Sequence, residues 1–536
     1  MVESIYIEFV LKNLPRVFTH VDRNQYSPTF GCCDRNYWHL KIQDFSSAIL
    51  QQACLTLALA YGNNFKGNIF YHNNNVFNWS QGIVSFWQSI QLKDGSFNEY
   101  FPNEHSLPAT AFTLYSVSET FKIINIKNNN VLDSMIMAGK YLANYTESEA
   151  SNQEIASFCA LYNLYTITDY KWLEKAYKKK LEKILKKQSQ EGWFMEYGGA
   201  DFGYLSVSLD YLSEYYLKSK DEKVLESLNK ILEFLKYFIH PDGTIGGQYG
   251  SRNTAYFLPN GLEALVSLGN KTAKDIKALI FKKINKLYFQ DSIDDRYIMH
   301  YVLHSFLRAI KIEKTNQGGN YHNLPCFEEH IKYFNQSGLL TVNNGNYFLI
   351  SAFKKGGLIK LYKNNKEVFV DFGYIAKNDK NVLVTNWVDD NIQVGNNKNY
   401  YYLTIKFNKI KIQTSSTFNH LVLRVAAKIF GRKIIKFLKN KLITINNFED
   451  IKLIRIIRIK QESIVIYDQI ISSRKITSLF AANNFSFRLV PSDKFFTKTD
   501  LLDNSGIEIF NFFNLKILRK FNVNSKKLNI FIKKNK

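Results

Sequence analysis

The sequence predicts an N-terminal (α/α) toroid of helical hairpins followed by a C-terminal antiparallel β-sandwich. Three observations support this fold class: a turn motif that recurs along the first half of the chain, six apolar helical segments separated by charged ones, and alternating strand patterns after residue 320. We expect residues 1–318 to form the toroid domain and residues 319–536 to form the sandwich domain.

The recurring motif is a small-residue turn, then an aromatic residue, a polar loop and an apolar helix. Its turn glycines are Gly95, Gly192 and Gly243, and a weaker copy at 143–153 divides the longer gap. The resulting period of about 50 residues accommodates two helices with their connections. An array of such hairpins places its polar loops on one rim, so residues far apart in the sequence can meet in one pocket.

The helical segments alternate in character. Apolar segments rich in Ala, Leu, Ser and Tyr are expected to be inner helices, at 45–60, 105–121, 152–167, 204–217, 258–268 and 297–310. Charged amphipathic segments such as 170–187 and 222–237 lie between them and should face outward. Six units favour a ring, complete or open, and an open helical solenoid is the alternative with the same pattern.

After residue 320 the pattern changes to that of strands. Residues 338–353 predict a hairpin around Asn-Asn-Gly, a strong turn signal. Further alternating runs lie at 358–362, 401–413, 463–471 and 527–532. Together they predict the antiparallel sandwich. Residues 426–438 interrupt it as a helix or a long loop.

Composition bounds the class of protein. The chain of 536 residues carries a net charge of +23. It is 46% hydrophobic, and this apolar content excludes a disordered chain. Abundant Lys, Asn, Ile, Phe and Tyr are typical of an AT-rich genome, so we expect no nucleic-acid partner. Basic residues recur from Lys406 to Lys460, opposed there by Glu449 and Asp450. This region is either a binding surface for an anionic partner or a solvated surface.

Cysteine usage and the N-terminus predict a simple intracellular protein. The five cysteines are scattered, Cys54 and Cys159 within apolar helical patterns, so we expect neither disulfides nor a zinc site. Cys326 and His330 supply only two potential metal ligands, and no metal or cofactor is expected. The N-terminus lacks the features of a secretion signal, and no apolar run is long enough to span a membrane. We therefore expect a cytoplasmic location.

The loop 196–204 is the richest candidate for a site. Its glycines let a ligand approach the backbone closely, and Tyr197, Asp201 and Tyr204 add ionisable groups. Tyr204, nearest the start of an inner helix, is the expected proton-transfer residue. The alternative is a tight loop whose tyrosine hydroxyls cap helices.

Two other helix starts add candidates. Asn103 and His105 open one inner segment, and histidine exchanges protons readily near neutral pH. Asn152 and Gln153 open the next, where an amide at a helix N-terminus suits a carboxylate. The alternatives are a solvated histidine and a helix N-cap at Asn152.

Arg252 and Trp38 complete the set of binding residues. The planar guanidinium of Arg252 fits a carboxylate or sulfate, unless it forms a structural salt bridge. Trp38, in the polar and aromatic run 34–39, provides the kind of plane found in sugar-binding clefts, unless it belongs to the core.

Four stretches of the chain resemble heparinase II/III-type proteins: 30–39, 196–204, 250–253 and 355–357. The resemblance implies an α/α toroid followed by a β-sandwich, and lyase activity on glycans that contain uronic acids. It also implies an Asn or Gln that neutralises the uronate carboxylate, with Tyr and His moving protons.

The match to the family's site is incomplete. Tyr204 matches the family tyrosine in context, and either Asn152-Gln153 or Asn103 with His105 matches its Asn-His helix start. However, Gln153 stands where a histidine is expected, and one residue separates Asn103 from His105. The family's further histidine, from the β domain, has candidates in His322, His330 and His420.

These residues predict abstraction of the C5 proton of a uronic acid. Asn152, Gln153 and Arg252 would stabilise the enolate, and Tyr204 and His105 would act as base and acid. β-Elimination would make the protein a polysaccharide lyase. Return of a proton to the opposite face would make it a C5-epimerase. The expected partner is in either case an anionic polysaccharide or oligosaccharide.

Two other classes stay open from the sequence. One is a catalytically silent glycan-binding protein, which the incomplete Asn-His match favours. The other is a hydrolase, which would need two carboxylates across the cleft, such as Asp201 with Glu104 or Glu154.

Overall fold

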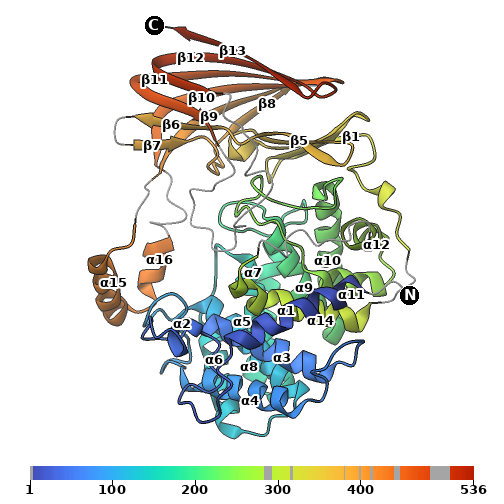
Figure 1. Cartoon of the computed structure of the whole chain (residues 1–536), viewed down its shortest axis with the longest axis vertical. Helices are drawn as coiled ribbons and strands as arrows, with labels where there is room; N and C mark the ends of the chain where they lie inside the picture. The colour runs from blue at the N-terminus through green and yellow to red at the C-terminus, as the bar shows by residue number, and fades with distance from the viewer. Residues whose placement is uncertain are drawn as a thin grey trace.

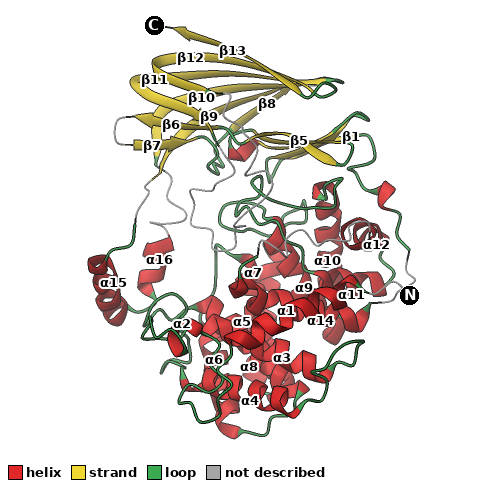
Figure 2. Ribbon diagram, viewed as in Figure 1, coloured by secondary structure: helices red, strands yellow, loops and turns green. Residues whose placement is uncertain are grey.

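The computed structural model describes residues 4–282, 293–313, 318–378, 381–397, 400–410, 414–439, 447–482 and 507–535. Helices make up the N-terminal region and strands most of the C-terminal region, as predicted, and the two regions are stacked along the long axis of the molecule (Figures 1 and 2). Among the described residues, no helix combines the length and apolar character needed to cross a bilayer.

The predicted inner segments form helices that follow one another in a cycle. They are α3 (Ala53–Gly62), α5 (Leu107–Ile123), α7 (Ser151–Thr168), α9 (Phe202–Ser219), α11 (Pro259–Ser267) and α14 (Leu303–Ile312). Each contacts the next in this order, and α14 contacts α3 again. The shorter α13 (Asp295–Tyr297) and the π-helical turn η4 (Ile298–Val302) lead into α14.

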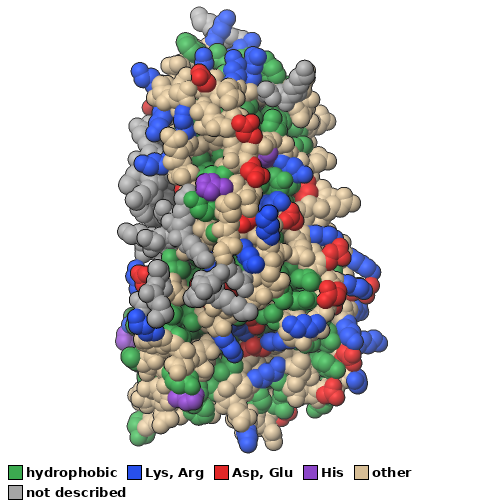
Figure 3. Space-filling model, turned by 90° about the vertical axis from the view of Figure 1, so that its right-hand side faces the viewer, with side chains coloured by type: hydrophobic (Ala, Val, Ile, Leu, Met, Phe, Trp, Pro, Cys, Tyr) green, Lys and Arg blue, Asp and Glu red, His purple; other side chains and the backbone are tan. Residues whose placement is uncertain are grey.

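A second set of helices, which includes both predicted charged segments, lies outside the first. They are α1 (Ile5–His20), α4 (Asn74–Ser89), α6 (Asn129–Asn144), α8 (Lys171–Lys186), α10 (Glu222–Leu235) and α12 (Lys271–Lys277), and α2 (Arg35–Trp38) precedes the first inner helix. α8 buries Leu173, Tyr177, Leu181 and Ile184 at helical spacing. Figure 3 shows Lys and Arg interspersed with Asp and Glu over the helical half of one face, which keeps that face hydrated.

The repeated turns have one structural role. Gly95 and Gly192 have φ of +87° and +107°. A Cβ on Gly95 would lie 2.3 Å from a carbonyl oxygen of α6, and a Cβ on Gly192 would lie 2.1 Å from a carbonyl oxygen of α10. Four residues earlier, Gln91 and Gln188 each donate a hydrogen bond to the carbonyl of their own turn glycine and another to the same outer helix. The turns therefore fix each polar loop on the neighbouring outer helix, and only glycine allows that approach.

The strands form two antiparallel groups. The first is the meander β1 (His330–Phe334), β2 (Leu339–Asn343), β3 (Phe348–Ala352), β4 (Leu358–Lys363) and β5 (Lys366–Asp371). The second contains β6 (Tyr374–Asn378), β7 (Asn381–Val384), β8 (Gln393–Asn397), β9 (Tyr400–Ile410), β10 (Phe448–Ile459), β11 (Ser463–Ala481), β12 (Glu508–Asn522) and β13 (Lys527–Asn535). The pairing of β2 with β3 confirms the predicted hairpin.

The second group is more closed than a plain sheet. The long strand β11 pairs with β10 along its first half and with β6 near its end. Strands β6, β7, β9, β10 and β11 are thereby connected in a circuit. The segment predicted as helix or loop forms two helices between β9 and β10, α15 (Thr417–Phe430) and α16 (Lys433–Lys439).

The two groups of strands share one apolar core with a buried ion cluster inside it. Leu349 and Leu361 of the first group and Leu403 of the second belong to that core. Arg455 of β10 lies 2.8 Å from Asp468 of β11 and 3.2 Å from Asp371 of β5.

Arg519 of β12 joins the cluster at 2.6 Å from Asp468 and 2.9 Å from Asp371. Burial raises the pKa of Asp371, but Arg455 and Arg519 outweigh it and hold that pKa below its usual value. The cluster therefore ties the two groups of strands together with both signs of charge paired.

We expect Asp468→Asn to lower the free energy of unfolding by about 3–5 kcal/mol, because it leaves two buried guanidinium groups underpaired. Denaturant unfolding of the full chain measures this. Asp390→Asn is the matched control, because Asp390 pairs with Lys354 at the surface and its loss should cost less than about 0.5 kcal/mol. Equal stability of the two variants would contradict this role of the cluster.

Candidate functional site

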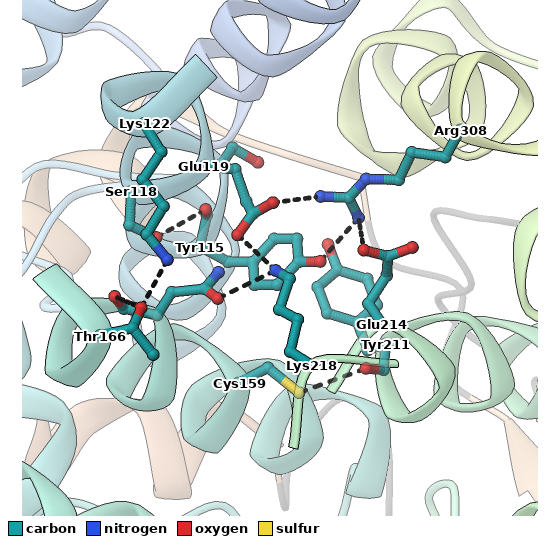
Figure 4. A network of polar contacts seen from close by, with 12 residues as sticks. Tyr115, Ser118, Glu119, Lys122, Cys159, Thr166, Tyr211, Glu214, Lys218 and Arg308 are labelled. Atoms are coloured by element: carbon teal, nitrogen blue, oxygen red, sulfur yellow. Dashed lines mark hydrogen bonds and ion pairs between the residues drawn. The ribbon is translucent and has the colours of Figure 1, made fainter. Parts of the chain in front are cut away.

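The ends of the inner helices define two opposite rims, and one of them is closed by charge pairs. Near the C-terminal ends, Glu119 of α5 lies 2.6 Å from Lys218 of α9 and 3.0 Å from Arg308 of α14 (Figure 4). Arg308 also donates to the hydroxyl of Tyr115 over 2.6 Å. Burial raises the pKa of Glu119, but the two cations outweigh it and lower that pKa to about 2. This rim is a structural closure.

The opposite rim carries the predicted site residues. Asp201 is the N-cap of α9 and accepts hydrogen bonds from the backbone N–H groups of Tyr204 (3.3 Å) and Arg252 (2.9 Å). Thr254 donates its hydroxyl to the same carboxylate. Asp201 is 1% exposed, so it acts by joining the backbones of Tyr204 and Arg252 beneath the surface of the rim.

Gln153, Tyr197 and Arg252 form a second contact group on this rim. The Gln153 amide in the first turn of α7 donates to the Tyr197 hydroxyl over 3.4 Å. The Arg252 guanidinium lies 4.6 Å from the centre of the Tyr197 ring, a cation–π contact. Tyr197 has a φ of +50°, which turns the loop at this point. Three segments of the chain thus bring an amide, a phenol and a guanidinium together.

Asn152 lies behind the rim. Its side-chain amide donates to Glu196 Oε2 over 2.6 Å and its backbone N–H donates to Glu196 Oε1 over 2.8 Å. The helix begins at Ser151, with Ala150 as the N-cap, so Asn152 has no capping role. Burial raises the pKa of Glu196 to about 8. The pair fastens the loop 196–204 to the start of α7.

His105 is held in the next loop along the rim. Its Nδ1 lies 2.7 Å from Asp94 Oδ2 and 2.9 Å from Ser96 Oγ. A Cβ added to Gly431, between α15 and α16, would lie 3.8 Å from its Nε2. The Tyr204 ring has different neighbours from His105. It packs edge-on against Tyr256, with 6.5 Å between the ring centres.

The remaining predicted residues lie in supporting positions. Asn103 occupies a left-handed turn with a φ of +58°. Trp38 of α2 donates its indole N–H to the carbonyl of His20 over 2.9 Å, which ties α2 to the end of α1.

Sequence reasoning missed a group of tyrosines beside Tyr204. Tyr256 and Tyr301 share a hydrogen bond of 2.6 Å between their hydroxyls. Burial and the nearby Tyr204 raise the pKa of Tyr297, so this tyrosine keeps its proton at neutral pH. The four-residue spacing of Tyr297 and Tyr301 at the start of a predicted inner segment is the signal that could have identified them.

A second cation was also missed. Arg296 lies 2.6 Å from Glu99, and its guanidinium lies 4.8 Å from the centre of the ring of Tyr100, which is 53% exposed. Glu104 accepts hydrogen bonds from the backbone N–H groups of Glu99 and Tyr100. Burial and Glu99 raise the pKa of Glu104 to about 8. Nothing in the local sequence around Arg296 links it to the loop near residue 100.

The candidate histidines of the C-terminal region have other surroundings. His330 in β1 contacts the Thr341 hydroxyl at 3.0 Å, His322 lies in the short turn η5 (Tyr321–Asn323) and His420 is exposed on α15. Across the described ranges, no three His, Cys, Asp or Glu side chains are grouped as metal ligands. Cys54 and Cys159 are buried, in agreement with the expectation of core residues.

Lys355 connects the strands to the site. Its ammonium donates to the carbonyls of Gln248 (2.6 Å) and Gly250 (2.7 Å) and to the side-chain oxygen of Asn253 (2.5 Å). These three acceptors belong to the loop that carries Arg252. A pocket beside it is lined by both regions, including Met195, Gly198, Ser251, Lys354 and Val388.

Comparison with known proteins yields similarity of fold. No protein-family model and no curated sequence matches the chain. A Paenibacillus xanthan lyase matches with a TM-score of 0.52 at 11% identity, over 89% of this chain and 46% of its own. A Streptomyces coelicolor A3 chondroitin AC lyase, solved with chondroitin sulphate, matches with a TM-score of 0.52 at 9% identity, over 81% of this chain and 63% of its own.

At such identities the likeness concerns the fold alone, a helical region followed by strands. The chain spans about half the length of the xanthan lyase and under two thirds of the chondroitin lyase. Membership of the heparinase II/III-type family stays a prediction from the short motifs.

We expect Lys355→Met to loosen the loop 248–253, because three buried acceptors lose their donor at about 1–3 kcal/mol each. Hydrogen exchange at the amides of Gly250 and Arg252, both bonded in the native loop, should become roughly tenfold faster. Lys354→Met is the control, because Lys354 donates to the carbonyl of Gln336 and to Asp390, both outside this loop. Unchanged exchange in Lys355→Met would contradict the positioning role.

The buried carboxyl of Glu196 predicts that the free energy of unfolding falls as the pH rises. The pKa of Glu196, about 8 in the folded chain, lies above its unfolded value of about 4.3, so its contribution is complete at acidic pH and is lost as the pH approaches 8. The loss is at most about 1.4 kcal/mol per pH unit.

Glu196→Gln should therefore flatten the fall in unfolding free energy between about pH 5 and 8. Denaturant titrations across this range measure the slope, and Glu226→Gln on the exposed side of α10 should leave it unchanged. A wild-type slope retained in Glu196→Gln would refute the assignment.

Proposed function

We propose that the helices form an (α/α) toroid domain, residues 1–318, and that residues 319–536 form a β-sandwich domain closed at one end by the strand circuit. The cycle of contacts from α3 to α14 and back supports the toroid. The apolar core common to both groups of strands supports the sandwich.

We further propose that the rim at the starts of α7 and α9 binds a glycan containing uronic acids. One observation carries this proposal: Gln153, Tyr197, Arg252 and Tyr204, from three separate segments, are connected through direct contacts and through Asp201. Guanidinium and amide groups recognise a carboxylate, and tyrosine rings provide planes for a sugar. The shared fold of two polysaccharide lyases is consistent with this substrate class.

The reaction favoured by these residues is β-elimination. Arg252 and Gln153 would bind the uronate carboxylate and stabilise the enolate that forms when the C5 proton leaves. Tyr204 would carry out proton transfer. Its phenolate would remove the C5 proton, the C4–C5 double bond would form as the C4–O bond breaks, and the resulting phenol would return the proton to the released oxygen. His105 is oriented by Asp94 and would contact a sugar unit bound near the loop that carries this histidine.

Two alternative functions would use the same rim residues. A C5-epimerase would form the same enolate and return a proton to the opposite face, and the tyrosines near Tyr204 offer a second proton donor. A silent glycan-binding protein would keep the carboxylate contacts alone. The hydrolase has less support, because both Asp201 oxygens accept hydrogen bonds from within the fold.

The test is incubation of the full chain with heparan, alginate and chondroitin-type polymers. A rise in ultraviolet absorbance from unsaturated products indicates elimination. Solvent deuterium at C5 without chain cleavage indicates epimerisation, and binding without either signal indicates the silent protein. Absence of both binding and turnover with all three polymers would contradict the proposed substrate class.

We expect Tyr204→Phe to reduce turnover by about 10²–10⁴-fold while glycan binding persists, because the phenol acts in proton transfer. Gln153→Leu should reduce turnover by about 10²–10³-fold through loss of enolate stabilisation. Tyr170→Phe, at an exposed residue before α8, is the control. Full activity of Tyr204→Phe would exclude this role, whichever polymer is the substrate.

A further inference from the structure

The helical hairpin α15–α16 is inserted between two strands and rests against the edge of the helical region. Arg424 of α15 binds Asp44 through two hydrogen bonds of 2.6 and 2.8 Å. The Arg432 guanidinium lies 4.2 Å from the centre of the Tyr145 ring. Figure 1 shows the hairpin at this edge, beside α2. These contacts fix which side of α15 faces the protein.

The opposite side of α15 is apolar and faces solvent. Phe418, Leu421, Val422, Val425 and Ile429 are 74%, 59%, 50%, 59% and 67% exposed. Their spacing of three and four residues places them on one helical stripe. Ala427, on the side toward the protein, is buried.

The exposed stripe thus reverses the usual arrangement of a surface helix, whose apolar face packs on the core. Further apolar side chains are exposed at the last residue of α15, Phe430 (59%), and on α16 at Phe437 (60%). On the adjoining helical region, Leu40 and Ile42, 55% and 70% exposed, lie shortly before Asp44 in the sequence. Exposed apolar side chains in this number mark an interaction site.

The charge of the hairpin indicates what covers the stripe. Residues 417–439 contain six Lys or Arg and no Asp or Glu: Arg424, Lys428, Arg432, Lys433, Lys436 and Lys439. A second copy of this chain would bring the same positive charge against itself. A soluble polyanion would pair with the cations but would leave the phenylalanine, leucine and isoleucine side chains in water.

We propose that α15 and α16 bind the surface of an anionic phospholipid membrane. An amphipathic helix with cations beside a Phe- and Leu-containing stripe lies in the plane of the interface, with the stripe among the acyl chains and the cations at the headgroups. The turn of the hairpin lies beside His105, because a Cβ on Gly431 would lie 3.8 Å from the Nε2 of that ring. The candidate rim then lies next to the bilayer, whatever reaction it supports.

The test is co-sedimentation of the full chain with vesicles. Phosphatidylcholine vesicles containing phosphatidylglycerol should bind at least tenfold more protein than vesicles of phosphatidylcholine alone, and salt should weaken the binding. Equal binding to both vesicle types, or no binding to either, would overturn the proposal.

Variants distinguish the hairpin from general basic charge. Leu421→Ser with Ile429→Ser, and Lys428→Glu with Lys433→Glu, should each reduce binding about tenfold or more. The matched controls are Leu268→Ser with Ile331→Ser at exposed sites elsewhere, and Lys175→Glu with Lys179→Glu on the exposed side of α8. Circular dichroism verifies that every variant is folded. Equal losses in variants and controls would overturn the assignment to the hairpin.

Two further measurements separate the other occupants. Sedimentation velocity without lipid detects a dimer, and a dimer abolished by Leu421→Ser with Ile429→Ser would assign the stripe to a second copy. Heparin binding that depends on Lys428 and Lys433 but not on Leu421 and Ile429, without vesicle binding, would assign the hairpin to a polyanion. Either result would overturn the membrane proposal.

Discussion

The buried ion cluster around Arg455 of β10 is the interaction on which the packing of the two groups of strands depends. Arg455 pairs with Asp371 and Asp468 and also donates to the carbonyls of Gly356 and Gly357. Both glycines have positive φ, and a Cβ on Gly356 would lie 2.3 Å from a carbonyl oxygen of the strand region. The next residue back, Lys355, holds the loop that carries Arg252. One chain of contacts therefore leads from the core between the strands to the candidate site.

This chain of contacts explains why the site needs both regions. A buried charge left unpaired is costly, so Arg455 specifies its partners more sharply than apolar packing would. Its bonds to Gly356 and Gly357 fix the backbone at Lys355, whose ammonium in turn satisfies three acceptors of the helical region. Without this lysine the loop would keep only hydrogen bonds to the helical region, such as those of Asp201 and Ser251.

The sequence predicted the helical framework well because each element carries local evidence for itself. The apolar segments became the inner helices, α7 and α11 within one residue of their expected bounds. The turn glycines Gly95 and Gly192 recur because each meets a carbonyl of an outer helix. The site was harder to predict. Asn152 and Gln153 are adjacent in α7 and lie about 100° apart around the helix, so their side chains point in different directions. Which of the two faces the candidate rim depends on Glu196, which lies far along the sequence and binds Asn152. Likewise, the basic character of the region around α15 was evident, but the direction of its apolar stripe depends on Arg424 and Asp44.

The polarity of the inner helices gives the two rims opposite electrostatic character. The helix N-termini, with their positive dipole ends, lie at the starts of α5, α7 and α9 on the candidate rim. The C-terminal ends, where carbonyls leave a negative potential, hold Lys218 and Arg308 together with Glu119. The cations at the closed rim thus offset the dipoles there, whereas the dipoles at the open rim act in the same sense as Arg252 and Arg296. The direction of the helices thus supports the proposed binding of an anionic glycan at this rim.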